Sequence, residues 1–212
     1  MQFLEEWKQK SKWHFDWFSN KQDPYFVKTI CNLKGDWNPD IKIKKILRND
    51  AYRTVGHQKS YKNTNIDYEN LYLEGMFDKE VNKEYQKIID AIGLDNPRIT
   101  IHVQIPGQMH TLHMDFAHGG GKWEYLGDKK EEKLGRVFVM LDDWYPGQVI
   151  LMANEHIVKW KKGDVVYFRW QDVPHGTCNF GHENRPMLFI TGEITDKFQK
   201  LLNSKEKQII NI

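Results

Sequence analysis

Two histidines and an aspartate in this sequence have the residue types and order of a metal-binding set. His113 and Asp115 are separated by one residue in a stretch that is expected to be a strand. Side chains of a strand alternate between its two faces, so both would lie on the same face. Together with the more distant His175, they can occupy one triangular face of an octahedral metal, an arrangement typical of non-haem Fe(II) sites. The pattern therefore predicts an iron site formed by His113, Asp115 and His175.

A single arginine accompanies this set. Arg185 begins the last predicted strand, at the start of an apolar run. If its guanidinium is buried, a bidentate contact with a carboxylate would satisfy it with charge-assisted hydrogen bonds. The alternative is a surface ion pair with Glu183 or Glu193, worth less than about 1 kcal/mol. Taken alone, His175 could likewise be a hydrogen-bonded core histidine.

Short strands must position these residues. From residue 98 onward, apolar and polar residues alternate as in half-buried strands, and Pro-Gly or Lys-Gly pairs separate several segments. Strands without intervening helices favour two sheets packed as a jelly roll, a mainly β fold with flanking helices. The predicted strands cover residues 98–105, 111–116, 135–142, 148–153, 156–160, 164–170, 176–180 and 186–194.

The segment before residue 98 is expected to be helical and to pack outside this sandwich. Residues 2–18 carry an aromatic stripe typical of an amphipathic helix. A second helix is predicted from Asp78, which can cap it, to Gly93, which can end it. No Pro/Gly/Ser linker separates the helical segment from the strands. The sequence thus predicts one domain over residues 1–212, with a helical N-terminal segment over residues 1–97, a jelly-roll core over residues 98–194 and a C-terminal helix over residues 195–212.

The bulk composition excludes few classes of function. The formal net charge of +2 does not indicate nucleic acid or an anionic membrane as a partner. Cys31 and Cys178 lack disulfide-framework or zinc spacing, which favours a reducing compartment. The sequence also has no signal-peptide core and no run of about 18 apolar residues. We expect a cytoplasmic protein, whose basic run at 42–62 is a solvated face or attracts an acidic substrate.

Two stretches, IPGQMHTLHMD and VPHGTCNFGHENRPMLFITGE, resemble the double-stranded β-helix of Fe(II)- and 2-oxoglutarate-dependent oxygenases. The stretch VFVMLDDWYPGQVILM is similar to prolyl hydroxylase-like members. The ten-residue gap from His175 to Arg185 is similar to that of both prolyl hydroxylase-like and aspartyl/asparaginyl hydroxylase-like members. The resemblance implies that His113, Asp115 and His175 hold iron and that Arg185 binds the distal carboxylate of 2-oxoglutarate. It further implies a dioxygenase that consumes O₂ and 2-oxoglutarate and releases succinate and CO₂.

The substrate is left open by the sequence. The likeness to prolyl hydroxylases favours a protein or peptide side chain, with a small metabolite or free amino acid next and a nucleobase third. Two other interpretations compete, namely a cupin-type metal enzyme without 2-oxoglutarate and a non-catalytic jelly-roll module that binds sugar or peptide. Cupins usually present His-x-His where this chain has His-x-Asp, and Arg185 would then have no role.

Several neighbouring residues are secondary candidates. Gln104, at the end of a predicted strand, could hydrogen-bond co-substrate or substrate, or it could be a plain strand-end amide. Alternation predicts that Thr177 and Asn179 share the face of His175, while His110 lies on the face opposite to His113. The glycine-containing stretch 117–134 resembles a mobile lid or, alternatively, a surface loop.

Overall fold

The computed structural model describes residues 27–40, 73–76, 83–113, 133–152, 155–170, 173 and 175–212, with the backbone alone at 73–76 and 110–113. Outside these ranges lie the predicted helix over 2–18, the basic run at 42–62, the predicted ligand Asp115 and nearly all of the predicted lid.

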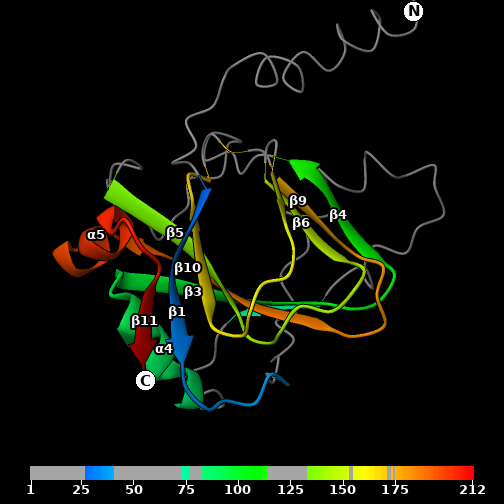
Figure 1. The fold of residues 1–212 in the computed structure, drawn as a ribbon, viewed down its shortest axis with the longest axis horizontal. Helices are drawn as coiled ribbons and strands as arrows, with labels where there is room; N and C mark the ends of the chain where they lie inside the picture. The colour runs from blue at the N-terminus through cyan, green and yellow to red at the C-terminus, as the bar shows by residue number, and fades with distance from the viewer. Residues whose placement is uncertain are drawn as a thin grey trace, which may run out of the picture.

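The chain folds into two facing sheets, which form a jelly roll (Figure 1). The seven-stranded sheet has the order β11-β1-β8-β5-β10-β3-β2, and the four-stranded sheet has the order β4-β9-β6-β7. The larger sheet comprises β1 (Val27–Lys34), β2 (Leu73–Met76), β3 (Asp95–Gln104), β5 (Leu134–Met140), β8 (Asp164–Phe168), β10 (Arg185–Glu193) and β11 (Gln208–Asn211). The smaller comprises β4 (Gln108–His113), β6 (Gln148–Met152), β7 (Glu155–Ile157) and β9 (His175–Asn179). The predicted jelly roll is confirmed, and its eight predicted strands correspond to β3 through β10.

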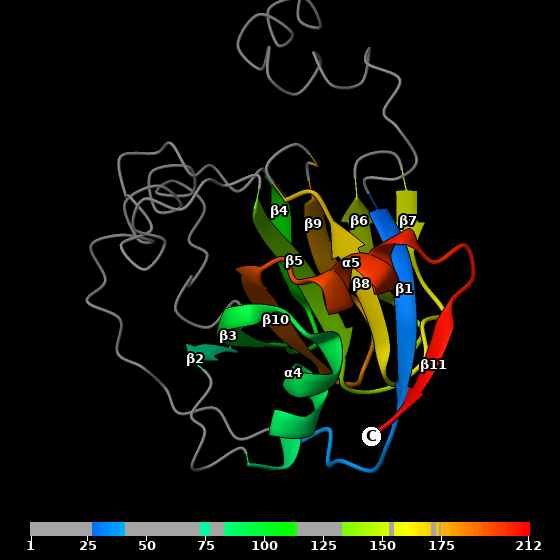
Figure 2. The ribbon, with the colours of Figure 1, turned by 90° about the vertical axis from the view of Figure 1, so that its left-hand side faces the viewer.

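Two short helices cover the outer side of the larger sheet (Figure 2). A 3-10 turn over Lys83–Tyr85 leads into α4 (Gln86–Ile92), which ends at Gly93 with a left-handed φ of 75°. Glycine adopts this conformation without a Cβ clash, so the predicted end of the helix is confirmed. Helix α5 (Asp196–Asn203) begins after Thr195, whose side chain accepts a hydrogen bond from the backbone N–H of Phe198. Among the described residues, no helix is long and apolar enough to cross a membrane.

Strand alternation divides the apolar residues into two cores. On β10, Leu188 and Ile190 face the helices, whereas Met187 faces the smaller sheet. The outer core includes Ile88, Ile92, Ile101 and Phe198 from the helices and β3. The core between the sheets includes Phe138, Met140, Ile150, Val166 and Phe168. Arg185 lies two residues before Met187 on β10, so its side chain also points toward the smaller sheet.

The two ends of the described chain differ from the sequence prediction. Strands β1 and β2 lie in the segment over residues 1–97 that was expected to be helical, and neither strand was predicted. The expected C-terminal helix stops at Asn203, after which β11 forms a strand. Strand β11 runs parallel to β1, with Cys31 opposite Gln208 and Lys34 opposite Asn211. This pairing satisfies backbone groups at the edge of β1, and the β-branched residues of β11 suit a strand. The conformation of these last residues is therefore decided by a partner strand distant in sequence.

Candidate functional site

The first feature of the site is a pairing between two strands of the smaller sheet. His113 on β4 lies directly opposite His175 on β9 in the antiparallel ladder. Opposite residues of such a pair share a face of the sheet, with Cα atoms roughly 4.5–5.5 Å apart. The fold thus brings the positions of two predicted ligands together. The third, Asp115, lies just past the described end of β4.

Strand β4 carries an irregularity beside this pair. His110 lies opposite Thr177 and His113 opposite His175, so three steps along β4 match two steps along β9. Such a bulge inserts one residue and changes the alternation of faces. Position 110 consequently lies on the same face as position 113. The prediction that His110 lies on the opposite face was wrong.

His175 is held firmly in the inner core. Its side chain is buried, and its Nδ1 lies 2.9 Å from the carbonyl oxygen of Val173. A carbonyl oxygen only accepts hydrogen bonds, so Nδ1 must carry the proton in this contact, which leaves a lone pair on Nε2. The ring also packs edge-on against Phe168, with centroids 5.0 Å apart. A backbone contact of this kind fixes the tautomer and orientation of a metal-binding histidine.

Arg185 is the most unusual residue between the sheets. Its side chain is only 3% exposed, and Nη1 donates a long hydrogen bond of 3.3 Å to the Val149 carbonyl on β6. The Nε atom has no hydrogen-bond partner, and no carboxylate among the described residues pairs with the guanidinium. The surface ion pair with Glu183 or Glu193 is therefore not formed. Burial lowers the pKa of Arg185 from its ordinary value to about 9, so the group is still a cation at neutral pH.

Gln104 lies beside this arginine and reaches the smaller sheet. It is the direct partner of Arg185 in the ladder between β3 and β10. Its Nε2 donates to the hydroxyl of Thr177 at 3.0 Å, while its Oε1 is buried without a partner. Thr177 lies two positions from His175 on β9, so the prediction that the two share a face agrees with this inward contact. An unsatisfied buried polar group costs about 1–3 kcal/mol, and more when it is charged.

Buried amides close the end of the sandwich below Arg185. Asn179 donates to the carbonyl oxygens of Gln104 and Glu183, both at 2.9 Å. Gln148, which is fully buried, donates to the Glu183 carbonyl at 3.0 Å. These contacts exclude water and keep the local dielectric low, which strengthens any charge interaction made there. Gln148 could not be predicted from the sequence, because nothing in its local pattern distinguishes a buried strand-end amide from an exposed one.

An aromatic wall extends from the histidine along the inner face of the larger sheet. Beyond Phe168, the ring centroids of Phe138 and Phe189 follow at successive separations of 5.8 Å. His102 stacks on Phe189 at 4.3 Å. The wall presents an apolar surface next to His175, suited to excluding water from a reacting group. The sequence analysis did not identify this wall, because its rings come from β3, β5, β8 and β10.

A second buried arginine provides a contrast within the same sandwich. Arg136 donates from Nε to the Thr191 hydroxyl at 2.8 Å, and its guanidinium lies 4.5 Å from the ring centroid of Trp170. Its buried charge is thus compensated by a hydrogen bond and a cation–π contact. These contacts make Arg136 part of the framework, whereas among the described residues Arg185 has a single long hydrogen bond.

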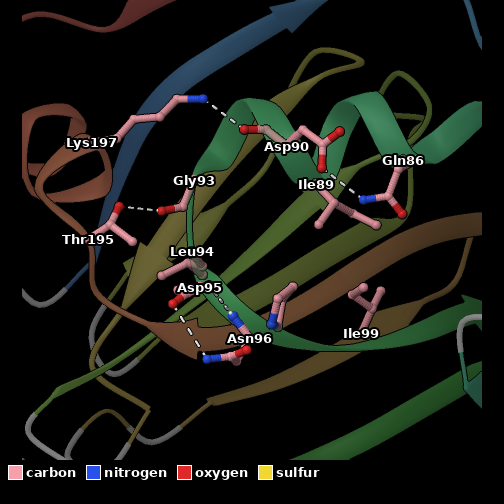
Figure 3. A pocket seen from close by; sticks show the side chains of 11 residues that line it. Gln86, Ile89, Asp90, Gly93, Leu94, Asp95, Asn96, Ile99, Thr195 and Lys197 are labelled. Carbon is pink, nitrogen blue, oxygen red and sulfur yellow. Dashed lines mark hydrogen bonds between the residues drawn. The ribbon is translucent and has the colours of Figure 1, made fainter.

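A hollow of about 640 Å³ lies elsewhere, on the outer side of the larger sheet between α4 and the start of α5 (Figure 3). Its polar groups are largely satisfied by one another. Lys197 donates to the Asp90 carbonyl, Thr195 donates to the Gly93 carbonyl, and Asn96 donates to the Asp95 carboxylate (Figure 3). The hollow presents no set of groups suited to catalysis, so we assign the chemistry to the space between the sheets.

The residues present fit a metal and an acidic co-substrate. Within the described ranges no group of three His, Cys, Asp or Glu side chains could hold a metal ion. Only His175 of the predicted set has a described side chain there. That side chain has its Nδ1 bound by a carbonyl, which suits Nε2 for a metal. The buried Arg185, with its unpartnered Nε, is complementary to a carboxylate.

Comparison with protein-family models and with curated proteins gives no match for this chain. Solved structures of similar fold include a Pseudomonas putida prolyl-4-hydroxylase, with 16% identity, 66% of this chain and 82% of that chain covered, and a TM-score of 0.43. A predicted oxalate decarboxylase from Thermotoga maritima has 14% identity, coverage of 57% and 79%, and a TM-score of 0.34. A sugar phosphate isomerase of the cupin superfamily from Silicibacter pomeroyi has 16% identity, coverage of 50% and 55%, and a TM-score of 0.31. These similarities concern the fold alone.

Proposed function

We propose that this chain is an Fe(II)- and 2-oxoglutarate-dependent dioxygenase that hydroxylates a C–H bond. The observation that carries the proposal is the Arg185 guanidinium, buried between the sheets without a described carboxylate partner. Such a cation suits the carboxylate of a ligand that enters the sandwich. Gln104 lies beside Arg185 and contacts Thr177. Thr177 is two residues from His175 along β9, which corresponds to a distance of roughly 6.6 Å between their Cα atoms. One small dicarboxylic acid would then bind with one end at Arg185 and the other end toward His175.

Each residue has a role in this proposal. His113, Asp115 and His175 would hold Fe(II), Arg185 would hold the distal carboxylate of 2-oxoglutarate, and Gln104 would hydrogen-bond the co-substrate or the substrate. When bound, Fe(II) and 2-oxoglutarate supply the oxidation, in which O₂ and 2-oxoglutarate yield succinate, CO₂ and a hydroxylated substrate.

The rest of the site would keep these groups in place. The Val173 carbonyl orients the ring of His175, and Phe168 packs against that ring. The aromatic wall and the buried amides exclude water from the space between the sheets.

The substrate class is proposed on weaker grounds. The resemblance to prolyl hydroxylase-like sequences supports a protein or peptide side chain, and a small metabolite or free amino acid is the second choice. The apolar wall beside His175 is compatible with either. We further propose a single cytoplasmic domain that requires neither nucleic acid nor a membrane.

The main rival is a cupin-type metal enzyme that uses no 2-oxoglutarate. The pairing of His113 with His175 suits it equally well. It leaves the Arg185 charge without a ligand, however, and a buried charge without a counter-ion is costly. This difference favours the oxygenase.

Anaerobic addition of Fe(II) and 2-oxoglutarate tests the proposal. We expect a weak visible metal-to-ligand charge-transfer band and, once O₂ and a substrate from peptide or amino-acid pools are added, succinate. The band should disappear in Arg185→Ala and persist in Arg169→Ala, a control at an exposed arginine. Tight iron binding without any band on addition of 2-oxoglutarate would instead support the cupin-type enzyme.

A further inference from the structure

Gln104 and Thr177 connect the two sheets between the Arg185 guanidinium and His175. Gln104 is the ladder partner of Arg185, and its amide donates to the Thr177 hydroxyl across the gap between the sheets. Thr177 in turn lies two positions from His175 on β9. The amide is therefore adjacent to the anion site and linked to the strand that carries a proposed metal ligand.

The contact with Thr177 leaves the amide incompletely satisfied. Gln104 is only 3% exposed, and its Oε1 has no hydrogen-bond partner. The adjacent Arg185 has an unpartnered Nε as well. An apolar side chain could connect the sheets without burying an unpaired carbonyl. The unpartnered Nε of Arg185 needs an acceptor, which a bound carboxylate would supply. The unpartnered Oε1 of Gln104 needs a donor, which the neighbouring Thr177 hydroxyl can supply if the amide rotates.

The chemistry of the amide determines how it could meet a carboxylate. In the ligand-free chain, Nε2 donates to Thr177 Oγ1 at 3.0 Å and, weakly, to the Thr177 carbonyl at 3.5 Å. The amide oxygen would repel a carboxylate held by Arg185, so an N–H must face that carboxylate. A hydroxyl both donates and accepts, so Thr177 can bind either end of the amide. After a 180° rotation, Oε1 accepts from the Thr177 hydroxyl and Nε2 is available to the ligand.

We propose that Gln104, oriented by Thr177, is a specificity-determining residue that recognises the distal carboxylate of the co-substrate together with Arg185. The inference rests on the proposed function, because it requires that the ligand of Arg185 be a 2-oxo dicarboxylic acid. Gln104 selects such an acid over a 2-oxo acid of the same length that lacks the second carboxylate. Thr177 acts as a positioning residue, which holds the amide in the orientation that donates to the ligand.

Titration calorimetry on the full chain tests this assignment. The titrations are anaerobic, use Mn(II) as a redox-inactive substitute for Fe(II), and compare 2-oxoglutarate with 2-oxopentanoate, which lacks the distal carboxylate. We expect Gln104→Met, which preserves side-chain length, to weaken 2-oxoglutarate binding about 10- to 100-fold. The affinity for 2-oxopentanoate should change by less than about two-fold, because no hydrogen bond to that ligand is lost.

Thr177 supplies a second, independent pair of variants. Thr177→Val keeps the shape of the side chain and removes the hydroxyl, and it should produce the same selective loss. Thr177→Ser restores the hydroxyl and should restore most of the affinity. In the wild type, the side-chain amide NMR signals of Gln104 should shift on addition of 2-oxoglutarate and not of 2-oxopentanoate.

The outcomes separate this inference from the proposed function. If Gln104→Met lowers the affinity for 2-oxoglutarate and for 2-oxopentanoate equally, Gln104 only stabilises the contact between the sheets, and the inference is overturned. If Arg185→Leu binds 2-oxoglutarate as tightly as the wild type, the anion site and the proposed function both fail. If Arg185→Leu loses binding while Gln104→Met and Thr177→Val retain it, the inference alone fails. Thermal denaturation of each variant identifies any that does not fold, and the Thr177 pair then decides.

Discussion

His113 on β4 and His175 on β9 are direct partners in an antiparallel ladder, so two histidines distant in sequence become neighbours on one face of the smaller sheet. Ladder hydrogen bonds determine the spacing of such positions, and groups carried by strands are held more precisely than groups carried by loops. The bulge between His110 and His113 sets this register. The pairing of the two positions follows from the ladder between β4 and β9.

The two buried arginines should respond in opposite ways to the same substitution. Arg185→Leu removes a buried charge with no described counter-ion, so we expect the free energy of unfolding to stay unchanged or to rise by about 1–4 kcal/mol. Arg136→Leu removes the contacts with Thr191 and Trp170 and should lower it by about 1–3 kcal/mol. Urea denaturation of both variants measures the difference. Equal destabilisation would mean that Arg185 is part of the framework.

Substitution of the proposed metal ligands should abolish turnover. We expect His113→Ala, Asp115→Ala and His175→Ala to lose both Fe(II) binding and succinate formation, because each removes one of three ligands. His156→Ala, at an exposed position on β7, is the matched control and should retain both. Metal content and succinate release are measured for each protein. Wild-type turnover in any of the three variants would remove that residue from the site.

The affinity for 2-oxoglutarate should be lost at high pH. Below about pH 9 the Arg185 guanidinium is a cation in the ligand-free protein, and its protonation does not alter binding. Above that pH Arg185 of the ligand-free protein loses its proton. Binding of the 2-oxoglutarate anion then requires the guanidinium to take up a proton again, so the affinity for 2-oxoglutarate falls by up to about ten-fold per pH unit. Calorimetric titrations from neutral pH to about pH 10 follow this loss. A flat profile across this range would show that the guanidinium stays protonated up to pH 10 and would contradict its lowered pKa.

The same shift has a defined sign for stability. The pKa of Arg185 is lower in the folded protein than in the unfolded chain, so above about pH 9 the unfolded state binds more protons at this group. The contribution of Arg185 to the free energy of unfolding therefore increases with pH in this window. The free energy of unfolding is measured as a function of pH for the wild type and for Arg185→Leu. The difference between the two curves gives the contribution of Arg185, because the titration of the other groups cancels.

Two turn glycines with similar backbone angles should differ in their tolerance of alanine. Gly107 has a φ of 83° with nothing near its missing Cβ, so Gly107→Ala should cost only about 1–2 kcal/mol of backbone strain. Gly163 has a φ of 85°, and a Cβ there would lie 2.0 Å from the Leu33 carbonyl oxygen. Gly163→Ala should therefore cost roughly 3 kcal/mol or more. Thermal denaturation compares the two variants, and similar melting temperatures would refute the close approach to β1.

Local patterns in the sequence were sufficient to predict much of the fold. Alternation and Pro-Gly turns predicted the eight strands β3 to β10, and Gly93 marked the end of α4, because these signals act between near neighbours. The sequence also named His113, His175, Gln104 and Arg185, because their residue types and order are visible without coordinates.

Only the tertiary structure decided the relations that depend on distant partners. The face of His110 follows from a bulge that exists only against β9, and the end of the chain is a strand because β1 offers it an edge. Arg136 and Arg185 look alike in sequence, yet only the packing of two sheets leaves one of them without a described counter-ion or compensating contact. Register and desolvation arise from contacts between segments far apart in the chain, so no local pattern encodes them.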